Sequence, residues 1–179
     1  IKNARESIKK AASVRATFGS YDAALEDVEA ERVIMSSSKF IDDHLWGWTP
    51  AEKKAGSING SRMNEIDEQR RAFVEGYRDV LPEPNTLSDV VREFVYWDWL
   101  YSVRHTATKE QGYEFGYSEH HESVYDRERY LEKLLATIKP VTRAEAIEVC
   151  RWFLESEKAQ YMENHGAAVI LNLVGECEE

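Results

Sequence analysis

Two adjacent histidines flanked by glutamates form the part of the sequence that most resembles a metal or catalytic site. They lie in the stretch YSEHHES, where Glu119 and Glu122 enclose His120 and His121. Imidazole and carboxylate groups are ligands that zinc and iron centres use in proteins. Successive residues of a helix point about 100° apart, so a helical doublet could turn only one histidine toward a metal ion.

A second set of potential ligands lies at Asp42-Asp43-His44. If two helices brought both stretches together, the groups around one metal ion would be Asp43, His44, His121 and Glu122. The chain contains neither the Glu-x-x-His motif of di-iron bundles nor the His-Glu-x-x-His motif of zinc proteases. A metal-dependent enzyme is therefore an alternative hypothesis, and the main prediction is a protein without a cofactor.

The histidine stretch also fits the start of a helix over about 119–138. Ser118 could cap this helix by accepting from backbone N–H groups of its first turn. The two glutamates would then lie where carboxylates offset the positive end of the helix dipole. On this interpretation His121 shares a side with Val124, at the edge of the core.

One acidic residue stands in an apolar setting and is a candidate buried acid. Asp98 lies between Trp97 and Trp99, in a segment that is otherwise apolar or aromatic on every side. A buried carboxylate must be hydrogen-bonded, ion-paired or neutral. Asp98 is therefore either a core residue paired with arginine or the acid of a pocket. The candidate partners are Arg70, Arg71 and Arg104.

Nucleophilic and phosphate-binding chemistry has little support. Cys150 lies within a helical pattern among apolar residues, which is typical of a small core residue. The sequence contains no Gly-x-Ser-x-Gly elbow and no Gly-rich phosphate loop of the Walker type. These observations lean against an enzyme.

Three aromatic residues spaced by two, in a segment with glycines, are candidates for a partner contact. Tyr113, Phe115 and Tyr117 lie in the stretch HTATKEQGYEFGY. Aromatic anchors dominate the energetics of protein interfaces, although these three could instead pack back on the domain. No Lys or Arg is interleaved with them, so stacking on single-stranded nucleic acid is not expected.

Hydrophobic periodicity predicts the helices that must position these groups. In the first segment, mainly apolar residues recur at alternating steps of four and three, which predicts one long helix over 2–36. The stripe consists of Ser7, Ala11, Val14, Phe18, Tyr21, Leu25, Val28, Arg32 and Met35. Its small and polar members favour an arm of an antiparallel bundle. A seam between subunits, giving a homo-oligomer through residues 7–35, is the second interpretation.

Cap and breaker residues delimit the other helices. Residues 49–52, 86–89 and 142–145 each have the Thr-x-x-acid pattern of a capping box. The predicted helices are a short one after Thr49, then 62–80, one opening at Thr86, 119–138, 143–163 and 167–174. Residues 105–117 are predicted to be a loop, or part of a short hairpin near 100–117.

Together these patterns predict an all-α protein, a helical bundle of five to seven helices in a single domain, 1–179. The long helix would cover 1–36, irregular or short helices 37–60, and the bundle core 61–179. A length of 179 residues, a hydrophobic fraction of 42% and only four prolines fit one helical domain with a core of its own.

Charge is unevenly distributed along this acidic chain. The net charge of −10 disfavours sequence-independent binding to DNA or anionic lipid. Residues 1–17 hold five Lys/Arg and one Glu, a net of +4, and residues 145–179 hold eight Glu and two Lys/Arg, a net of −6. These ends are solvated faces, or they support head-to-tail self-association or an acidic surface for a basic partner.

Cysteine content and hydropathy predict a cytoplasmic protein without a membrane anchor. Cys150 and Cys177 form neither a disulfide framework nor a zinc motif. The longest uncharged run near the C-terminus, GAAVILNLVG, is far shorter than the span of about 20 residues that a membrane helix needs. No signal peptide is visible, although the chain begins with Ile1 and a leader could have been lost.

The C-terminal pattern resembles that of small uncharacterised helical proteins from alphaproteobacteria and their prophages. KPVTRAEAIEVCRWFLESEKA followed by AAVILNLV is similar to their Pro-x-Thr/Ser start, amphipathic helix and short closing helix. Tyr21-Asp-Ala-Ala in the N-terminal segment is similar in style. The resemblance covers a minor part of the chain and implies no chemistry, but it suggests an accessory or phage-related product.

The main functional prediction is a non-enzymatic acidic helical protein that acts through contacts with an unknown protein partner. One alternative is the metal-dependent enzyme built on residues 42–44 and 119–122. The other is an acidic mimic of nucleic acid, which inhibits a basic DNA- or RNA-binding protein.

Overall fold

The computed structural model describes residues 2–37, 46–72, 77–156, 158 and 166–175. This part of the chain consists of helices and connecting segments without a β-strand, so the prediction of an all-α protein is confirmed. Within it, no helix is both long enough and apolar enough to cross a membrane.

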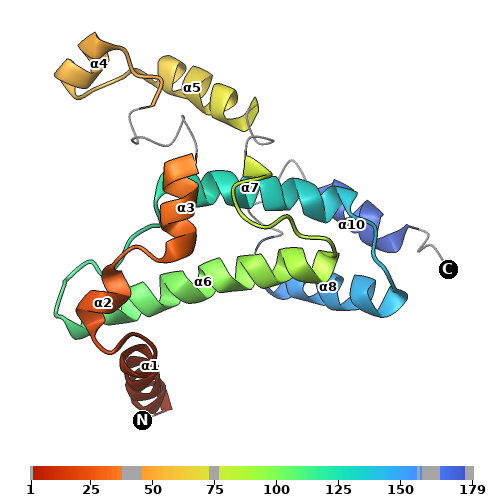
Figure 1. Cartoon of the computed structure of the whole chain (residues 1–179), viewed down its shortest axis with the longest axis horizontal. Helices are drawn as coiled ribbons and strands as arrows, with labels where there is room; N and C mark the ends of the chain where they lie inside the picture. Colours follow the sequence, from red (N-terminus) through yellow and green to blue (C-terminus); the bar gives the residue numbers. More distant parts are fainter. Residues whose placement is uncertain (1, 38–45, 73–76, 157, 159–165, 176–179) are drawn as a thin grey trace.

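The helices follow one another as labelled in Figure 1. Their bounds are α1 Lys2–Phe18, α2 Tyr21–Leu25, α3 Glu29–Ser37, α4 Pro50–Ala55, α5 Gly60–Ala72, α6 Leu87–Glu110, α7 Glu122–Thr137, α8 Arg143–Glu155 and α10 Gly166–Val174.

Helix α6 is the central element, and α1, α2, α7 and α8 all pack against it (Figure 1). A capping box fixes its start, as predicted. The Thr86 hydroxyl accepts from the Asp89 N–H at 3.1 Å, and the Asp89 carboxylate accepts from the Thr86 N–H at 3.1 Å. These bonds satisfy backbone donors that the first turn of a helix leaves unpaired.

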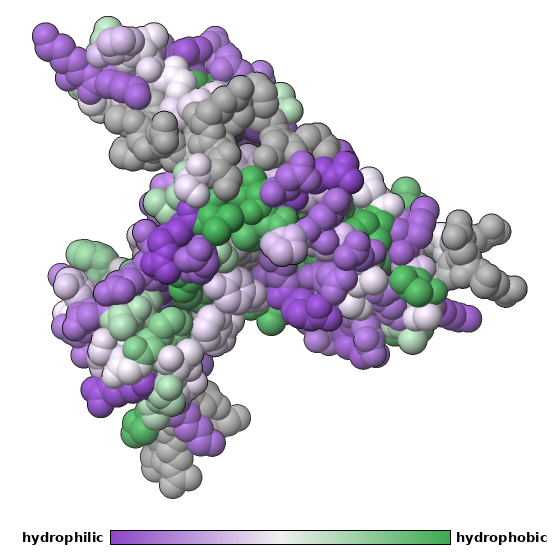
Figure 2. All heavy atoms as spheres, viewed as in Figure 1, coloured by the Kyte–Doolittle hydropathy of each residue, from purple (hydrophilic) through white to green (hydrophobic). Residues whose placement is uncertain are grey.

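The main hydrophobic core lies where α3, α6, α7, α8 and α10 meet. Its largest buried side chains are Ile34, Leu87, Phe94, Trp97, Leu100, Tyr130, Leu131, Leu135 and Phe153. Removing these side chains from water is the main favourable contribution to folding. On the face in Figure 2, hydrophobic residues gather over the junction of α3 and α7, whereas hydrophilic residues cover much of α4 and α5.

The N-terminal segment forms three helices, so the prediction of one continuous helix over 2–36 is wrong. Helix α1 ends before Gly19, which has φ +80° and donates its N–H to the Arg15 carbonyl at 2.8 Å. Glycine adopts this left-handed conformation without a steric penalty and commonly ends helices. The next residue, Ser20, caps α2 by accepting from the Ala23 N–H at 3.0 Å.

On α1, the predicted stripe turns toward the body of the protein. Ala11 and Val14 on α1 are buried in a small cluster with Val103 and Ala107 of α6. In α2 and α3 the buried residues are instead Ala24, Glu31 and Ile34, each one position before a member of the stripe, and Ser7 and Arg32 of the stripe are exposed. Self-association through residues 7–35 stays a prediction.

Three other boundaries differ from the predicted ones. Helix α6 continues to Glu110, so the predicted hairpin near 100–117 is wrong. Residues 78–80 lie in turns, so the helix does not continue to residue 80. Helix α8 ends at Glu155, where the Ser156 N–H donates to the Trp152 carbonyl. The short closing helix is confirmed as α10.

The capping box at residues 49–52 is also confirmed. The Glu52 carboxylate accepts from the Thr49 N–H at 2.6 Å, and the Thr49 hydroxyl accepts from the Glu52 N–H at 3.3 Å. Gly56, with φ +64°, ends α4 as expected. Helices α4 and α5 project from the body of the protein (Figure 1).

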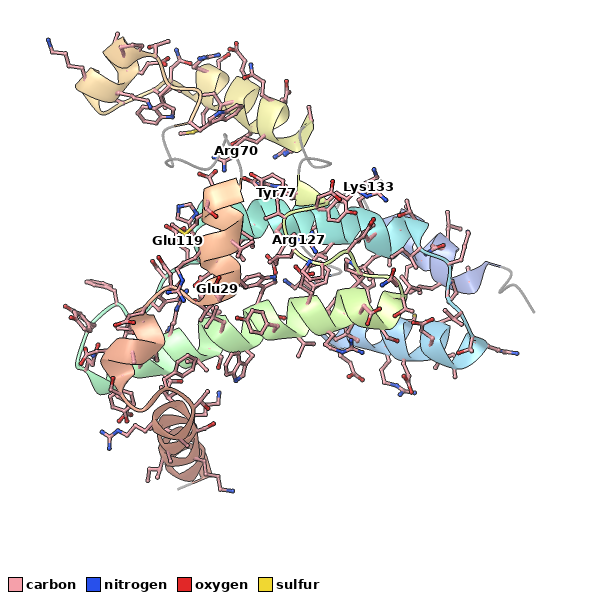
Figure 3. The ribbon with its side chains drawn as sticks, in the orientation of Figure 1. Glu29, Arg70, Tyr77, Glu119, Arg127 and Lys133 are labelled. Carbon is pink, nitrogen blue, oxygen red and sulfur yellow. The ribbon has the colours of Figure 1, made fainter. Side chains whose placement is uncertain are left out.

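Ion pairs connect this projection to α7. Arg70 of α5 donates to Glu122 at 2.8 Å and to Asp126 at 2.6 Å, and the hydroxyl of Tyr77 donates to Asp126 at 2.9 Å. Arg70 and Tyr77 are labelled in Figure 3. Buried charges are tolerated because they are paired in this way.

Candidate interaction site at the aromatic loop

Residues 111–121 join α6 to α7 and are termed the aromatic loop. Two of the three aromatic residues predicted to contact a partner point outward: the exposed fraction is 62% for Tyr113 and 86% for Phe115. Tyr117 is instead half-buried, and its hydroxyl accepts from Arg104. The predicted trio is thus divided into two exposed side chains and one that holds the loop in place.

The aromatic loop is held against the end of α6 by several hydrogen bonds. The Tyr117 N–H donates to the Thr108 hydroxyl at 2.8 Å, and its carbonyl lies 3.3 Å from His105 Nδ1. The Tyr113 N–H donates to the Thr108 carbonyl at 3.1 Å. Nearer α7, the His120 N–H donates to the Tyr125 hydroxyl at 3.1 Å. The loop therefore presents its exposed aromatic side chains from a fixed backbone.

Two glycines of the loop provide a test of this anchoring. Both have positive φ, +82° at Gly112 and +63° at Gly116. A Cβ at Gly116 would lie 3.1 Å from the His105 ring, whereas one at Gly112 would meet nothing within 4 Å. We expect Gly112→Ala to lower the free energy of unfolding by about 1–2 kcal/mol through backbone strain. Gly116→Ala should lower it further because it also displaces His105.

Chemical denaturation of the two alanine variants, followed by circular dichroism, checks this expectation. Equal losses of stability would show that contact with His105 does not restrain the loop.

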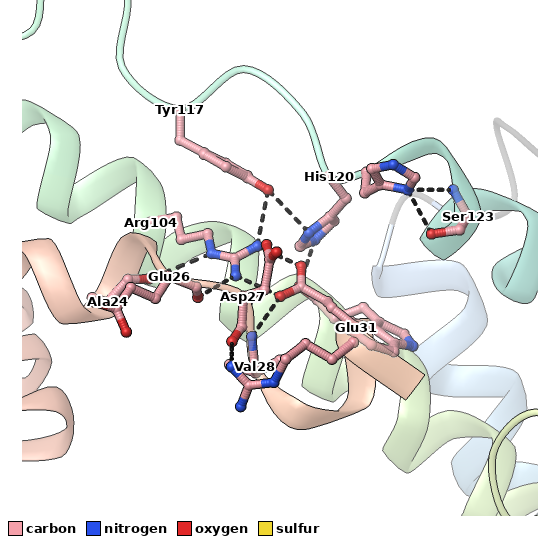
Figure 4. Close-up of polar contacts among 12 residues, drawn as sticks. Ala24, Glu26, Asp27, Val28, Glu31, Arg104, Tyr117, His120 and Ser123 are labelled. Carbon is pink, nitrogen blue, oxygen red and sulfur yellow. Dashed lines mark hydrogen bonds and ion pairs between the residues drawn. The ribbon is translucent and has the colours of Figure 1, made fainter. Parts of the chain in front are cut away.

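Arg104 is the centre of the anchoring network (Figure 4). Its guanidinium forms a bidentate pair with the Glu31 carboxylate, with both N–O distances at 2.5 Å. It also donates to the Tyr117 hydroxyl at 3.0 Å and to the Glu26 carbonyl at 2.9 Å. One buried cation therefore joins α2, α3, α6 and the aromatic loop, in the fork geometry that suits arginine and carboxylate.

Glu31 is held in place by its own helix. It is the third residue of α3, and its carboxylate accepts from the Val28 N–H at 2.9 Å. An acidic side chain in the first turn of a helix commonly makes this bond. The local capping of α3 and the long-range pairing with Arg104 thus use the same carboxylate.

The surroundings keep Arg104 charged and Tyr117 neutral. Burial alone would lower the pKa of Arg104, but hydrogen bonds and charge attraction from Glu31 raise that pKa above its ordinary value. Burial raises the pKa of Tyr117, although Arg104 opposes that shift. The Tyr117 hydroxyl therefore keeps its proton and can donate while it accepts from Arg104.

The histidine doublet has different roles from those predicted. His120 is the buried member, with its Nε2 3.0 Å from the Trp97 carbonyl. His121, rather than Ser118, caps α7 by accepting from the Ser123 N–H through Nδ1 at 3.3 Å. Glu122 lies in the first turn of α7 as predicted, but the helix begins there rather than at residue 119, and Glu122 pairs with Arg70.

Asp98 is not buried, so its prediction as a buried acid is wrong. Its side chain is 53% exposed, and its partner is Lys158 at 3.5 Å rather than an arginine. The segment that looked apolar on all sides is a helix with two faces. Trp97 lies inward, and Trp99 is partly exposed beside Asp98.

Two of the four residues proposed as metal ligands, His121 and Glu122, lie in the described part of the chain. In the described ranges, no group of three or more His, Cys, Asp and Glu side chains is arranged to hold a metal ion. Asp43 and His44 lie outside those ranges, so the set with His121 and Glu122 stays a prediction. Cys150 is a free thiol that packs, partly buried, against the main core.

Acidic residues surround the aromatic loop. Glu114 and Glu119 belong to the loop and Glu110 ends α6, and all three are exposed. Asp22 on α2 is drawn to the loop because its carboxylate accepts from Gln111 Nε2 at 2.5 Å. Lys109 is the one lysine or arginine within 105–121. The exposed aromatic residues therefore lie in a region of negative charge.

The fold and the site define an all-α protein with an anchored, aromatic, acidic loop at one end of its central helix. Comparison with protein-family models, with curated proteins and with solved structures gives no match to this chain.

Proposed function

We propose that this protein is a non-enzymatic accessory factor that binds another protein through the aromatic loop, with Tyr113 and Phe115 as anchors. The observation that carries the proposal is the 86% exposure of Phe115 on a loop whose backbone is fixed on both sides. A fixed loop loses little conformational entropy on binding, so more of the contact energy becomes affinity. Aromatic side chains are the residues most often found at the energetic centre of an interface.

The charge around the loop indicates the chemistry of the partner. Glu110, Glu114 and Glu119 would repel an acidic surface and attract a basic one. The partner that fits is a protein with an apolar pocket for Phe115 and with Lys or Arg at the rim of that pocket.

A capture experiment with the full chain tests the proposal. Replacing Tyr113 and Phe115 by alanine should reduce the amount of partner captured from host-cell extract at least tenfold. Each lost anchor of an interface costs about 2 kcal/mol or more, and about 1.4 kcal/mol corresponds to a factor of ten. Capture should also weaken as salt is raised, because salt screens the exposed charges.

Leu171→Ala is a matched control, because Leu171 is an equally exposed apolar residue on α10, away from the loop. Circular dichroism should show that both variants keep the fold. If the double variant captures the same protein as strongly as the Leu171→Ala variant does, the aromatic loop is not the binding site.

A further inference from the structure

His120 lies at the point where the aromatic loop meets α7, and its ring is buried. The aromatic rings of Trp97, Tyr101, Tyr117 and Tyr125 are edge-on to it at centroid distances of 5.8–6.2 Å. Its backbone N–H donates to the Tyr125 hydroxyl of α7, and its side chain hydrogen-bonds to the Trp97 carbonyl of α6. His120 therefore links three elements at one end of the loop.

The hydrogen bonds of the ring define its protonation state. A carbonyl oxygen can only accept, so the contact with Trp97 places the ring proton on Nε2. Nδ1 is then an acceptor, and the hydroxyl of Tyr117 lies 3.5 Å from it. That hydroxyl already accepts from Arg104, so its own proton is directed toward Nδ1 (Figure 4).

A second proton on the ring would disturb this arrangement. Protonated Nδ1 could no longer accept from Tyr117, and a cation would be buried near the guanidinium of Arg104. The other charged groups that act on the ring are Glu31 of α3 and Asp98 of α6, and both attract a cation. Burial is the largest influence and, with Arg104, it lowers the pKa of His120 below the ordinary value.

We propose that His120 is a proton-operated latch: protonation of its ring releases the aromatic loop from α6, so that presentation of Tyr113 and Phe115 depends on pH. The proposal rests on the proposed function of the loop as a binding site. A released loop must be ordered again on binding, so the partner is bound more weakly at acidic pH.

The sign of the pH dependence follows from the lowered pKa. The pKa of His120 is near 6.5 when the loop is released and lower when the loop is bound to α6. The state with the loop released therefore binds more protons as the pH falls. Attachment of the loop to α6 is therefore fully stable above about pH 6.5. Below that pH, the equilibrium constant between the attached and the released loop falls by up to about tenfold per pH unit.

The carboxyl groups of α7 whose pKa is raised cannot mimic this effect. Burial raises the pKa of Glu132 to about 7 and also raises the pKa of Glu122 and that of Glu128. A raised carboxyl pKa means that the folded protein takes up protons as the pH falls, which stabilises it. Their contribution has the opposite sign to that of His120.

Amide hydrogen exchange measured by NMR on the full chain between pH 7.5 and pH 5 tests the latch. The reporters are the Tyr117 and His120 amides, which bond to Thr108 and Tyr125. After correction for intrinsic exchange, their protection should fall by up to about tenfold per pH unit below about 6.5, while that of the buried Leu131 amide stays constant. Constant protection of the Tyr117 amide would overturn the proposal.

Substitutions assign the proton to one histidine. His120→Gln should abolish the pH dependence, whereas His121→Asn, which retains a capping side chain, and His105→Gln should keep it. Persistence in His120→Gln would overturn the proposal. If His120→Gln does not fold, the ring signals of His120 in the natural protein decide, because their midpoint must coincide with that of loop release.

Failure of the latch and failure of the proposed function give different results. Unchanged exchange with intact capture at pH 7.5 removes the latch alone. Unchanged capture by the Tyr113→Ala, Phe115→Ala variant at pH 7.5 removes the binding site, and the exchange data still report on His120.

Discussion

Replacing Arg104 by methionine is expected to lower the free energy of unfolding by about 3–5 kcal/mol. The substitution keeps an apolar side chain of similar length but leaves the carboxylate of Glu31 buried without its cation. An isolated buried charge is costly because neither water nor a partner stabilises it. The Tyr117 hydroxyl and the carbonyls of Ala24 and Glu26 lose a donor as well. Urea denaturation followed by circular dichroism measures the loss.

Arg32→Met is the matched control for Arg104→Met. Arg32 pairs with Glu29 at 3.3 Å, but both side chains are exposed. An exposed pair contributes about 0–1 kcal/mol, so this variant should be nearly as stable as the natural protein. Similar losses for Arg104→Met and Arg32→Met would contradict the role assigned to the buried pair.

A double variant distinguishes the stability that the Arg104–Glu31 ion pair contributes from the cost of leaving Glu31 buried without its cation. When Glu31→Leu is added to Arg104→Met, no uncompensated charge remains, and part of the lost stability should return. If stability falls further instead, the cap that Glu31 provides to the Val28 N–H outweighs the relief of its charge.

The parts of the fold that the sequence predicts well are those determined by neighbouring residues. Capping boxes at Thr49 and Thr86 form as expected because each needs only residues three positions apart. Thr142 also caps its helix, but Glu145 does not complete the box with Thr142. Its carboxylate accepts from the Val141 N–H and from Ser88, and so connects the start of α8 to the start of α6.

The break in the N-terminal segment also had a local signal. Gly19 and Ser20 are a helix stop followed by a helix cap. The stripe of apolar residues concealed that signal, because its spacing continues from Phe18 to Tyr21 across Gly19 and Ser20 without a break. Periodicity therefore predicted which residues of α1 face α6 but could not show where the helix ends.

The ion pair at the centre of the network that anchors the aromatic loop could not be predicted, because its two residues are far apart in the sequence. Glu31 and Arg104 are 73 residues apart. The same holds for the pair that links α5 to α7, since Asp126 and Arg70 are 56 residues apart. Arg104 does continue the inward positions of Trp97 and Leu100 at helical spacing, which marks it as a buried cation. Nothing local, however, indicates which of many carboxylates it meets.

The positions of the two histidines differ from the predicted ones because the start of α7 is shifted. Hydrophobic spacing indicated that His121 would lie at the edge of the core and gave no role to His120. The helix begins three residues later than its cap pattern suggested, at Glu122. That shift puts His121 at the cap and leaves His120 in the loop, where it can turn under the loop against Trp97.

Two neighbouring tryptophans of α6 give the second large effect. Trp97 is fully buried in the main core, whereas Trp99 is 40% exposed and stacks on Phe18 with ring centroids 6.0 Å apart. Trp97→Ala should lower the free energy of unfolding by about 3–5 kcal/mol, because it leaves a cavity that the packed core cannot fill. Trp99→Ala should cost about 1 kcal/mol, since it removes an aromatic contact at the surface.

Urea denaturation followed by circular dichroism distinguishes the two variants, and it does not depend on tryptophan fluorescence, which both substitutions change. The alanine backbone still offers the carbonyl to which His120 bonds, so Trp97→Ala tests packing and leaves that hydrogen bond available. A loss for Trp99→Ala as large as that for Trp97→Ala would mean that the face of α6 described as exposed is covered, by another part of this chain or by a second copy. Such a result would support the prediction of self-association through residues 7–35, because Phe18 of α1 is the ring on which Trp99 stacks.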